Sequence, residues 1–137
     1  MREVVVYVND ATKRRFEAKR EALRAAGKST NEIWVFHGTS SQSVINSIMR
    51  EGFRVGGKGV AVANGSVYGR GVYTATGPDT PMGTYAASTS RVILSRALTG
   101  REGPQEGVGV DMWRPRTDWA VFADPHALLP MYVLRYG

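Results

Sequence analysis

The stretch IWVFHGTSSQSVINSIMREGF, residues 33–53, decides the fold of this chain. Its first four residues form a short β-branched and aromatic run that predicts a strand at 33–36. Beyond the histidine and glycine that follow, Ser40 or Ser41 is suited to cap a helix, and Gly52 is suited to end it. The apolar residues between them recur at helical spacing, at Val44, Ile45, Ile48 and Met49. A strand that leads into a helix is therefore predicted.

The residues before this stretch predict another strand and helix. VVVYV at 4–8 has strand composition. Asn9 and Asp10 then offer N-cap oxygens, and residues 11–26 are rich in the helix formers Ala, Lys, Arg and Glu. The buried side of that helix is predicted from two apolar residues seven apart, Phe16 and Leu23.

After the stretch, the pattern changes to strands and loops. Residues 54–71 form a long glycine-rich loop with no helical period, and 78–88 read as a turn leading into a short helical segment. Residues 101–110 read as a loop. Strands are predicted at 71–75, 91–100, 118–122 and 131–136. Because strands and helices do not alternate, we expect one α+β domain over residues 1–137, with a largely antiparallel sheet.

Composition excludes several functional classes. The chain has no cysteine, so disulfides, thiolate zinc sites and a cysteine nucleophile are excluded. His37 and His126 are too far apart for a two-histidine metal motif, so no metal is predicted. No stretch is long and apolar enough for a signal peptide or a membrane span, so we expect an intracellular protein, cytoplasmic or nuclear. Gly52 to Lys58 resembles a phosphate-binding loop, but Gly59 stands where serine or threonine is required.

The formal net charge is +6, and many of the positive residues lie in the first thirty positions. Such a basic segment favours a polyanionic partner, such as nucleic acid or a dinucleotide. A solvated helix face is the alternative reading of the same charges.

Three features stand in an informative order. HGT at 37–39 follows a strand, two tyrosines flank a glycine pair in YGRGVY at 68–73, and Asp118 opens a strand near the C-terminus. Alone, each has an ordinary structural explanation. Together they resemble the catalytic domain of the poly(ADP-ribose) polymerase-like (diphtheria-toxin-like) ADP-ribosyltransferases. The similar segments are FHGT at 36–39, VINSIMREGF at 44–53, YGRGVYTA at 68–75, RVILSRALTG at 91–100 and WAVFADPHALLP at 119–130.

The resemblance implies the ADP-ribosyltransferase fold, with a split, mostly antiparallel sheet and two early helices, and NAD+ as substrate without a metal. It implies that the His37 side chain binds the adenosine ribose and that the Gly38 backbone pairs with the nicotinamide carboxamide. Thr39 would add a hydroxyl contact, and Tyr73 would line the nicotinamide pocket. The remaining NAD+-binding positions implied are Tyr68, Gly71, Tyr85 and Lys58, with Arg54 as a second phosphate contact.

The resemblance also implies a catalytic triad of His37, Tyr73 and Asp118. The polymerising members carry a glutamate where this chain has Asp118, whose carboxylate stands one methylene further back. Cleavage and a single transfer are therefore expected rather than chain elongation. A second departure is Met82, which falls where the family has a serine, with Thr80 or Thr84 as substitutes. No helical regulatory subdomain is expected.

The resemblance implies an ADP-ribosyltransferase (EC 2.4.2.-), which we expect to be a monomer. The acceptor is a protein side chain or a nucleic-acid terminal phosphate. Two alternatives stay open: an NAD+ glycohydrolase, in which water takes the place of the acceptor, and an inactive module that binds NAD+ or ADP-ribose.

Overall fold

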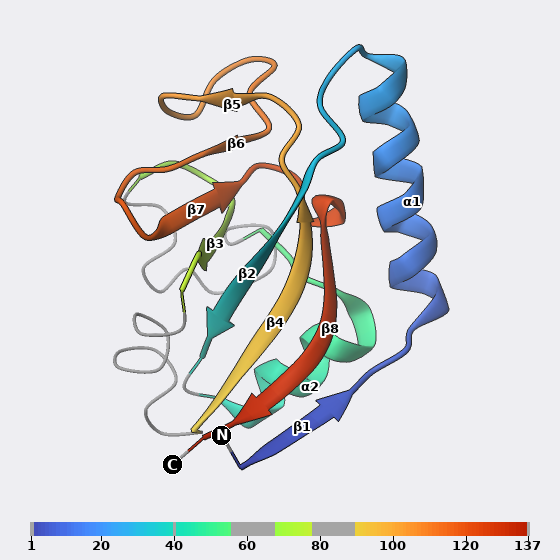
Figure 1. The fold of residues 1–137 in the computed structure, drawn as a ribbon, viewed down its shortest axis with the longest axis vertical. Helices are drawn as coiled ribbons and strands as arrows, with labels where there is room; N and C mark the ends of the chain where they lie inside the picture. Colours follow the sequence, from blue (N-terminus) through green and yellow to red (C-terminus); the bar gives the residue numbers. More distant parts are fainter. Residues whose placement is uncertain (1, 40, 56–67, 78–89, 137) are drawn as a thin grey trace.

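The computed structural model describes residues 2–39, 41–55, 68–77 and 90–136. Within them the chain forms two α-helices, one 3-10 turn and eight strands (Figure 1). The helices are α1 (Asp10–Ala25), α2 (Gln42–Glu51) and the 3-10 turn η2 (Pro125–Ala127). The strands are β1 (Glu3–Val6), β2 (Glu32–Gly38), β3 (Val72–Ala75), β4 (Arg91–Leu98), β5 (Glu102–Gly103), β6 (Met112–Trp113), β7 (Trp119–Phe122) and β8 (Leu128–Arg135).

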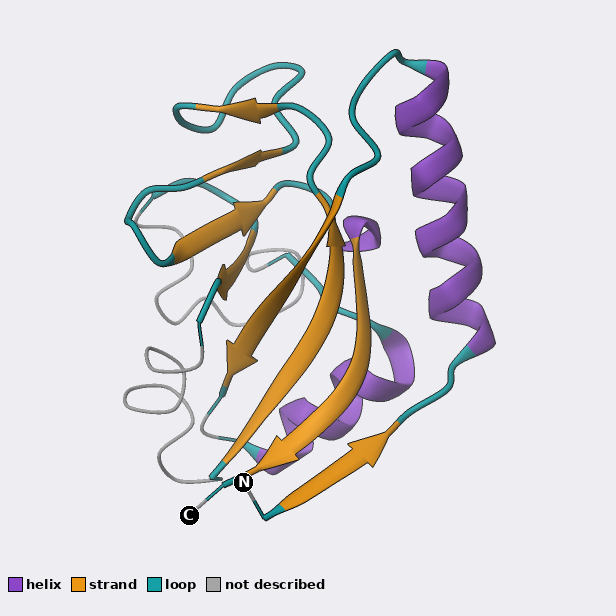
Figure 2. Ribbon diagram, in the orientation of Figure 1, coloured by secondary structure: helices purple, strands orange, loops and turns teal. Residues whose placement is uncertain are grey.

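The strands form one sheet in the order β1-β8-β4-β2-β3-β7-β6-β5. All neighbours pair antiparallel except β5 and β6, which are parallel. Long ladders join β2 to β4 and β4 to β8, but β2 and β3 share one register pair, Phe36 with Ala75. Figure 2 shows the two halves diverging at this point. The predicted α+β class and split, mostly antiparallel sheet are confirmed.

Both helices begin and end where the sequence indicates. The Asn9 side chain caps α1 by accepting hydrogen bonds from the N–H groups of Ala11 and Thr12. Phe16 and Leu23 are buried, as their spacing predicts. Ser41 caps α2, and Gly52 ends that helix at a φ of 89°. The buried side of α2 consists of Ile45, Ile48 and Met49.

The main core lies between one face of the sheet and the two helices. Its largest fully buried members include Phe16, Val35, Ile45, Ile93 and Phe122. A smaller cluster on the opposite face is built around Val92 and Leu134. None of the helices in the described ranges is long and apolar enough to cross a membrane.

One apolar residue of α2 is exposed, and the predicted bounds of the first strand were wrong. Val44 is 42% exposed, because it lies at the margin of the buried stripe of α2. β1 ends at Val6, so Tyr7 and Val8 lie outside it.

The C-terminal third holds the larger differences. β5 lies within the predicted loop at 101–110, and β6 was missed, because two-residue strands carry no periodic pattern. β8 begins three residues before 131. It accommodates Pro130 opposite Ser95, where the register with β4 shifts, and such an irregularity tolerates the missing N–H of proline. The predicted helical segment at 78–88 lies outside the described residues.

Candidate functional site

The predicted triad residues lie on, or immediately before, three neighbouring strands. His37 is near the end of β2, Tyr73 lies in β3, and Asp118 immediately precedes β7. Because the sheet order places β3 between β2 and β7, residues separated by 81 positions in sequence come together where the sheet divides. Figure 1 shows this division beside β2 and β3.

The His37 ring is held by a backbone carbonyl of β3. Its Nδ1 lies 3.0 Å from the carbonyl oxygen of Tyr73. Because a carbonyl oxygen only accepts, Nδ1 carries the proton and the neutral ring keeps a lone pair on Nε2. Burial lowers the pKa of His37, and this outweighs the hydrogen bond to Tyr73, which raises it. The ring also contacts the Phe53 ring edge-on, with 5.1 Å between the ring centres. His37 is therefore set up as a neutral acceptor.

The Tyr73 hydroxyl is engaged within its own loop. It accepts a hydrogen bond from the Tyr68 N–H at 2.7 Å and donates one to the Gly69 carbonyl at 2.7 Å. Burial is the main cause that raises the pKa of the Tyr73 phenol, so the hydroxyl stays protonated near neutral pH. The hydroxyl thus anchors the loop, and the ring is the part of Tyr73 that remains for contact with a ligand.

Tyr68 is fixed by residues that sequence reasoning missed. Its carbonyl accepts a hydrogen bond from Trp113 Nε1 at 2.7 Å, and its hydroxyl accepts one from Arg116 Nε at 3.0 Å. Its ring contacts the Trp119 ring edge-on, with 5.8 Å between the ring centres. Trp119 had one sequence signal, its position next to Asp118. Trp113 had none, because its contact with Tyr68 spans 45 residues.

Gly71 is required by the sheet. A Cβ at this position would lie 2.5 Å from the carbonyl oxygen of Phe122 and 2.8 Å from Cγ1 of Val121. A glycine at this position therefore permits the close approach between the loop and β7. Gly38 is the last residue of β2, where it pairs with Val92 of β4.

Asp118 is exposed and lies in a turn, so the prediction that it opens the strand was wrong by one residue. Its carbonyl accepts a hydrogen bond from the N–H of Thr76 at 2.9 Å, which fixes its backbone just beyond the end of β3. The Thr39 hydroxyl accepts a hydrogen bond from the N–H of Ser41, the cap of α2, at 3.4 Å.

The remaining predicted NAD+ contacts lie either outside the described residues or in an ion pair. Lys58, Tyr85 and Met82, with its two threonine substitutes, lie outside the described residues. Arg54, a predicted phosphate contact, forms an ion pair with Glu51 at 3.1 Å. A small cavity of about 20 Å³ lies between α1, Phe53 and η2, and it has room for about one water molecule. Its lining includes none of the three triad residues.

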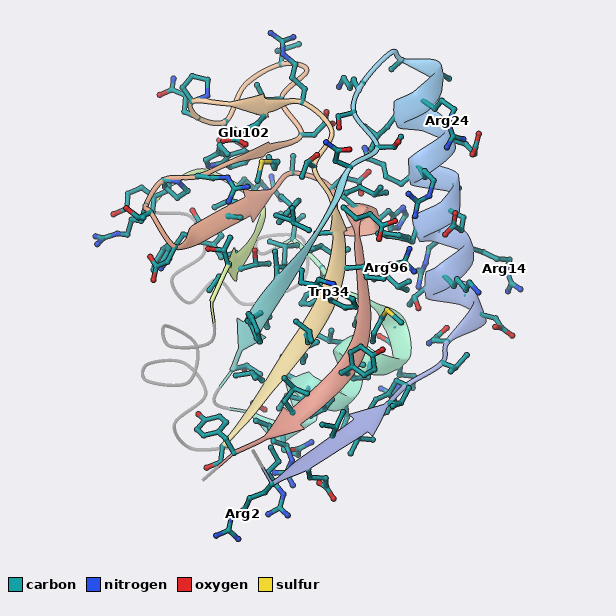
Figure 3. All side chains as sticks on the ribbon, viewed as in Figure 1. Arg2, Arg14, Arg24, Trp34, Arg96 and Glu102 are labelled. Carbon is teal, nitrogen blue, oxygen red and sulfur yellow. The ribbon has the colours of Figure 1, made fainter. Side chains whose placement is uncertain are left out.

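Much of the basic charge on and after α1 is paired. Among the seven cations at positions 13–28, four form ion pairs with carboxylates: Lys19, Arg20, Arg24 and Lys28. Within the described ranges, Lys13 and Arg14 form none. Figure 3 shows Arg14 on the side of α1 that faces away from the sheet. The helix therefore presents less free positive charge than its sequence suggests.

The comparisons with known proteins agree with this architecture. The family model of the poly(ADP-ribose) polymerase (PARP) catalytic domain matches residues 3–101. With an α+β fold, a split sheet and this match, the chain belongs to the PARP catalytic domain family. No curated protein sequence matches it.

Two solved structures are similar. The TASOR pseudo-PARP domain superposes with a TM-score of 0.77 at 15% identity, covering 96% of this chain and 80% of that one. The PARP domain of RADICAL-INDUCED CELL DEATH1 from Arabidopsis gives a TM-score of 0.67 at 15% identity, covering 96% and 84%. At this identity the likeness shows the fold alone.

Proposed function

We propose that this chain is an NAD+-dependent ADP-ribosyltransferase that transfers a single ADP-ribose. One observation carries the proposal: His37 Nδ1 bonds the Tyr73 carbonyl across the division of the sheet, and Asp118 lies in the turn just before β7, the strand that pairs with β3. Membership of the PARP catalytic domain family supports it.

The proposed reaction exchanges one bond at ribose C1′. The bond from C1′ to the nicotinamide nitrogen breaks, and its electron pair stays on that nitrogen, so nicotinamide leaves as a neutral molecule. A lone pair of the acceptor oxygen forms the new bond to C1′, and any proton on that oxygen passes to solvent. Because the transition state has oxocarbenium character, a nearby carboxylate stabilises it, and Asp118 is the proposed source.

His37 acts as a clamp in this scheme. With the proton fixed on Nδ1, its Nε2 accepts a hydrogen bond from a hydroxyl of the adenosine ribose. The Gly38 backbone pairs with the carboxamide, and the Tyr73 ring borders the nicotinamide. Tyr85 is proposed to stack on the other face of the nicotinamide, where an aromatic contact contributes about 0.5–1.5 kcal/mol beyond burial.

The length of Asp118 favours a single transfer. Proton transfer and hydroxyl orientation require contact at roughly 2.6–3.2 Å. An aspartate carries the charge that stabilises the cation, but it reaches one methylene less far than glutamate. Orienting a ribose hydroxyl for chain elongation is therefore expected to be inefficient.

The proposed acceptor is a protein side chain or a nucleic-acid terminal phosphate. A terminal phosphate is already an anionic nucleophile, and the positive charge of the chain favours its approach. Transfer to water would make the protein an NAD+ glycohydrolase.

A second candidate function is binding without catalysis. The PARP fold also occurs in a domain described as a pseudo-PARP, so membership of the family does not require catalysis, and a module that holds NAD+ or ADP-ribose and leaves it intact is the second candidate. The shorter acid at position 118 is consistent with that reading.

Product analysis separates these functions. The chain would be incubated with NAD+ labelled in the adenylate, alone, with a protein mixture, and with 5′-phosphorylated oligonucleotides. Label on an acceptor supports the transferase, and free ADP-ribose without labelled acceptor supports the hydrolase. Binding of NAD+ with neither product would overturn both enzyme functions in favour of the binding module.

A further inference from the structure

The loop that carries Tyr73, residues 68–73, is closed by the hydroxyl of Tyr73 itself. That hydroxyl joins the N–H of Tyr68 to the carbonyl of Gly69, each at 2.7 Å. The ring is thus held at both ends, since its Cα lies in β3 and pairs with Val121 of β7. The orientation of this ring therefore depends on where the 68–69 backbone lies.

Trp113 of β6 holds that backbone from outside. Its Nε1 donates to the Tyr68 carbonyl at 2.7 Å, and its side chain is 1% exposed. The indole packs so closely on the loop that a Cβ at Gly69 would lie 2.9 Å from Cζ2 of Trp113. Gly69 also has a φ of 106°, which favours glycine.

Arg116 and Trp119 hold the side chain of Tyr68. Arg116 donates to the Tyr68 hydroxyl at 3.0 Å, and its guanidinium carbon lies 5.6 Å from the centre of each of the Tyr68 and Trp119 rings. The Trp119 ring also contacts the Tyr73 ring edge-on, with 6.1 Å between the ring centres. All three polar groups of Tyr68, its N–H, carbonyl and hydroxyl, are therefore engaged.

We propose that the β6–β7 segment, residues 112–122, is a positioning element that fixes the ring of Tyr73 through Trp113, Arg116 and Trp119. This inference rests on the proposed function in so far as the Tyr73 ring borders nicotinamide. The segment lies beyond residues 3–101, the part of the chain that matches the family model. The family match therefore does not account for these contacts.

The β6–β7 segment affects the binding of NAD+ rather than the bond exchange, because it keeps the Tyr73 ring in the orientation that nicotinamide contacts. Loosening the loop lets the ring sample other orientations, which weakens binding of substrate and transition state alike. Such uniform loss raises the KM for NAD+ and leaves kcat nearly unchanged. A residue that took part in the bond exchange would instead lower kcat.

The test uses Trp113→Phe, which removes the Nε1 donor and keeps an aromatic side chain. The matched control is Trp34→Phe, because Trp34 is 49% exposed on β2, beside Arg96 of β4, and packs on Tyr132 rather than on the loop (Figure 3). Amide hydrogen exchange at Tyr68 and Gly69 is measured together with the kinetics of NAD+ turnover.

In Trp113→Phe we expect the Tyr68 amide to exchange about tenfold faster and the KM for NAD+ to rise about tenfold, since a hydrogen-bonded carbonyl loses its donor. We expect kcat within about twofold of wild type, unchanged exchange in β4, and no change in Trp34→Phe. Unchanged exchange at Tyr68, or a loss confined to kcat, would overturn the inference.

Arg116→Gln provides a second variant, because Arg116 is exposed and its replacement leaves the core intact. We expect a smaller rise in KM, about threefold, with a partial return in Arg116→Lys, which keeps a donor near the Tyr68 hydroxyl. Equal KM values in wild type and Arg116→Gln would remove Arg116 from the element. If wild type does not turn over NAD+, the proposed function is overturned. Faster amide exchange in Trp113→Phe would then still support the inference that Trp113 holds the 68–73 loop.

Discussion

At the level of single residues, the position of one proton determines what His37 can do. Because Nδ1 donates to the Tyr73 carbonyl and burial lowers the pKa of the ring, the neutral form with a free Nε2 lone pair is favoured. That form accepts a hydrogen bond from a hydroxyl and holds it in place. The ring is therefore a clamp for a ribose in our proposal, and the charge that assists bond cleavage comes from Asp118.

The lowered pKa of His37 predicts a pH dependence of stability. Below its ordinary pKa of 6.5, the unfolded chain binds a proton at this position that the folded chain resists. The free energy of unfolding should therefore fall as pH decreases from 6.5 towards the pKa of the folded state, by at most about 1.4 kcal/mol per pH unit.

Urea unfolding between pH 8 and pH 5 checks this pH dependence. His37→Gln should flatten the decline, whereas His126→Gln, at an exposed position on η2, should leave it in place. The same slope in wild type and His37→Gln would contradict the assignment of His37 as a half-buried neutral group.

Asp118 gives a second prediction at this scale. In Asp118→Glu the carboxylate gains one methylene, so it can reach a ribose hydroxyl that the aspartate holds poorly. We expect gel analysis to show products with more than one ADP-ribose, where wild type gives single additions. Single additions in both proteins would show that the length of this side chain does not limit elongation.

At the level of elements, β3 is the strand that assembles the site, since it bonds the His37 ring on one side and lies beside Asp118 on the other. The sequence predicted both helices and the long strands, because each has a local periodic or capping signal, whereas the motif residues were identified by their resemblance to a family. It missed β5 and β6 and the contacts of Trp113 and Arg116. Those depend on pairing between distant segments, which no local pattern records.

The fit of β3 against β7 predicts the effect of one added methyl group. In Gly71→Ala the Cβ would lie 2.5 Å from the backbone oxygen of Phe122, so the two strands must separate. We expect the free energy of unfolding to fall by about 1–3 kcal/mol in urea titrations. Gly77→Ala is the control, because its Cβ would meet nothing within 4 Å among the residues that the structure describes. A loss as small in Gly71→Ala as in Gly77→Ala would contradict this packing.

At the scale of the whole molecule, the sheet is divided between β2 and β3 into two halves of four strands, β1-β8-β4-β2 and β3-β7-β6-β5. The main core joins the two helices to strands of both halves, and the β6–β7 segment also supports the loop that carries Tyr73. The net charge of +6 already counts every carboxylate, and the ion pairs along α1 leave fewer unpaired cations on that helix, so any attraction for an anionic acceptor comes from the cations outside these pairs.

Release of nicotinamide from NAD+ is the most direct assay of the proposed transferase. We expect turnover by wild type and by His126→Gln, and a loss of about 100-fold or more in Asp118→Ala, since one electrostatic contact in a transition state is worth about that factor. Turnover that is unchanged in Asp118→Ala, or absent from wild type while NAD+ still binds, would contradict it.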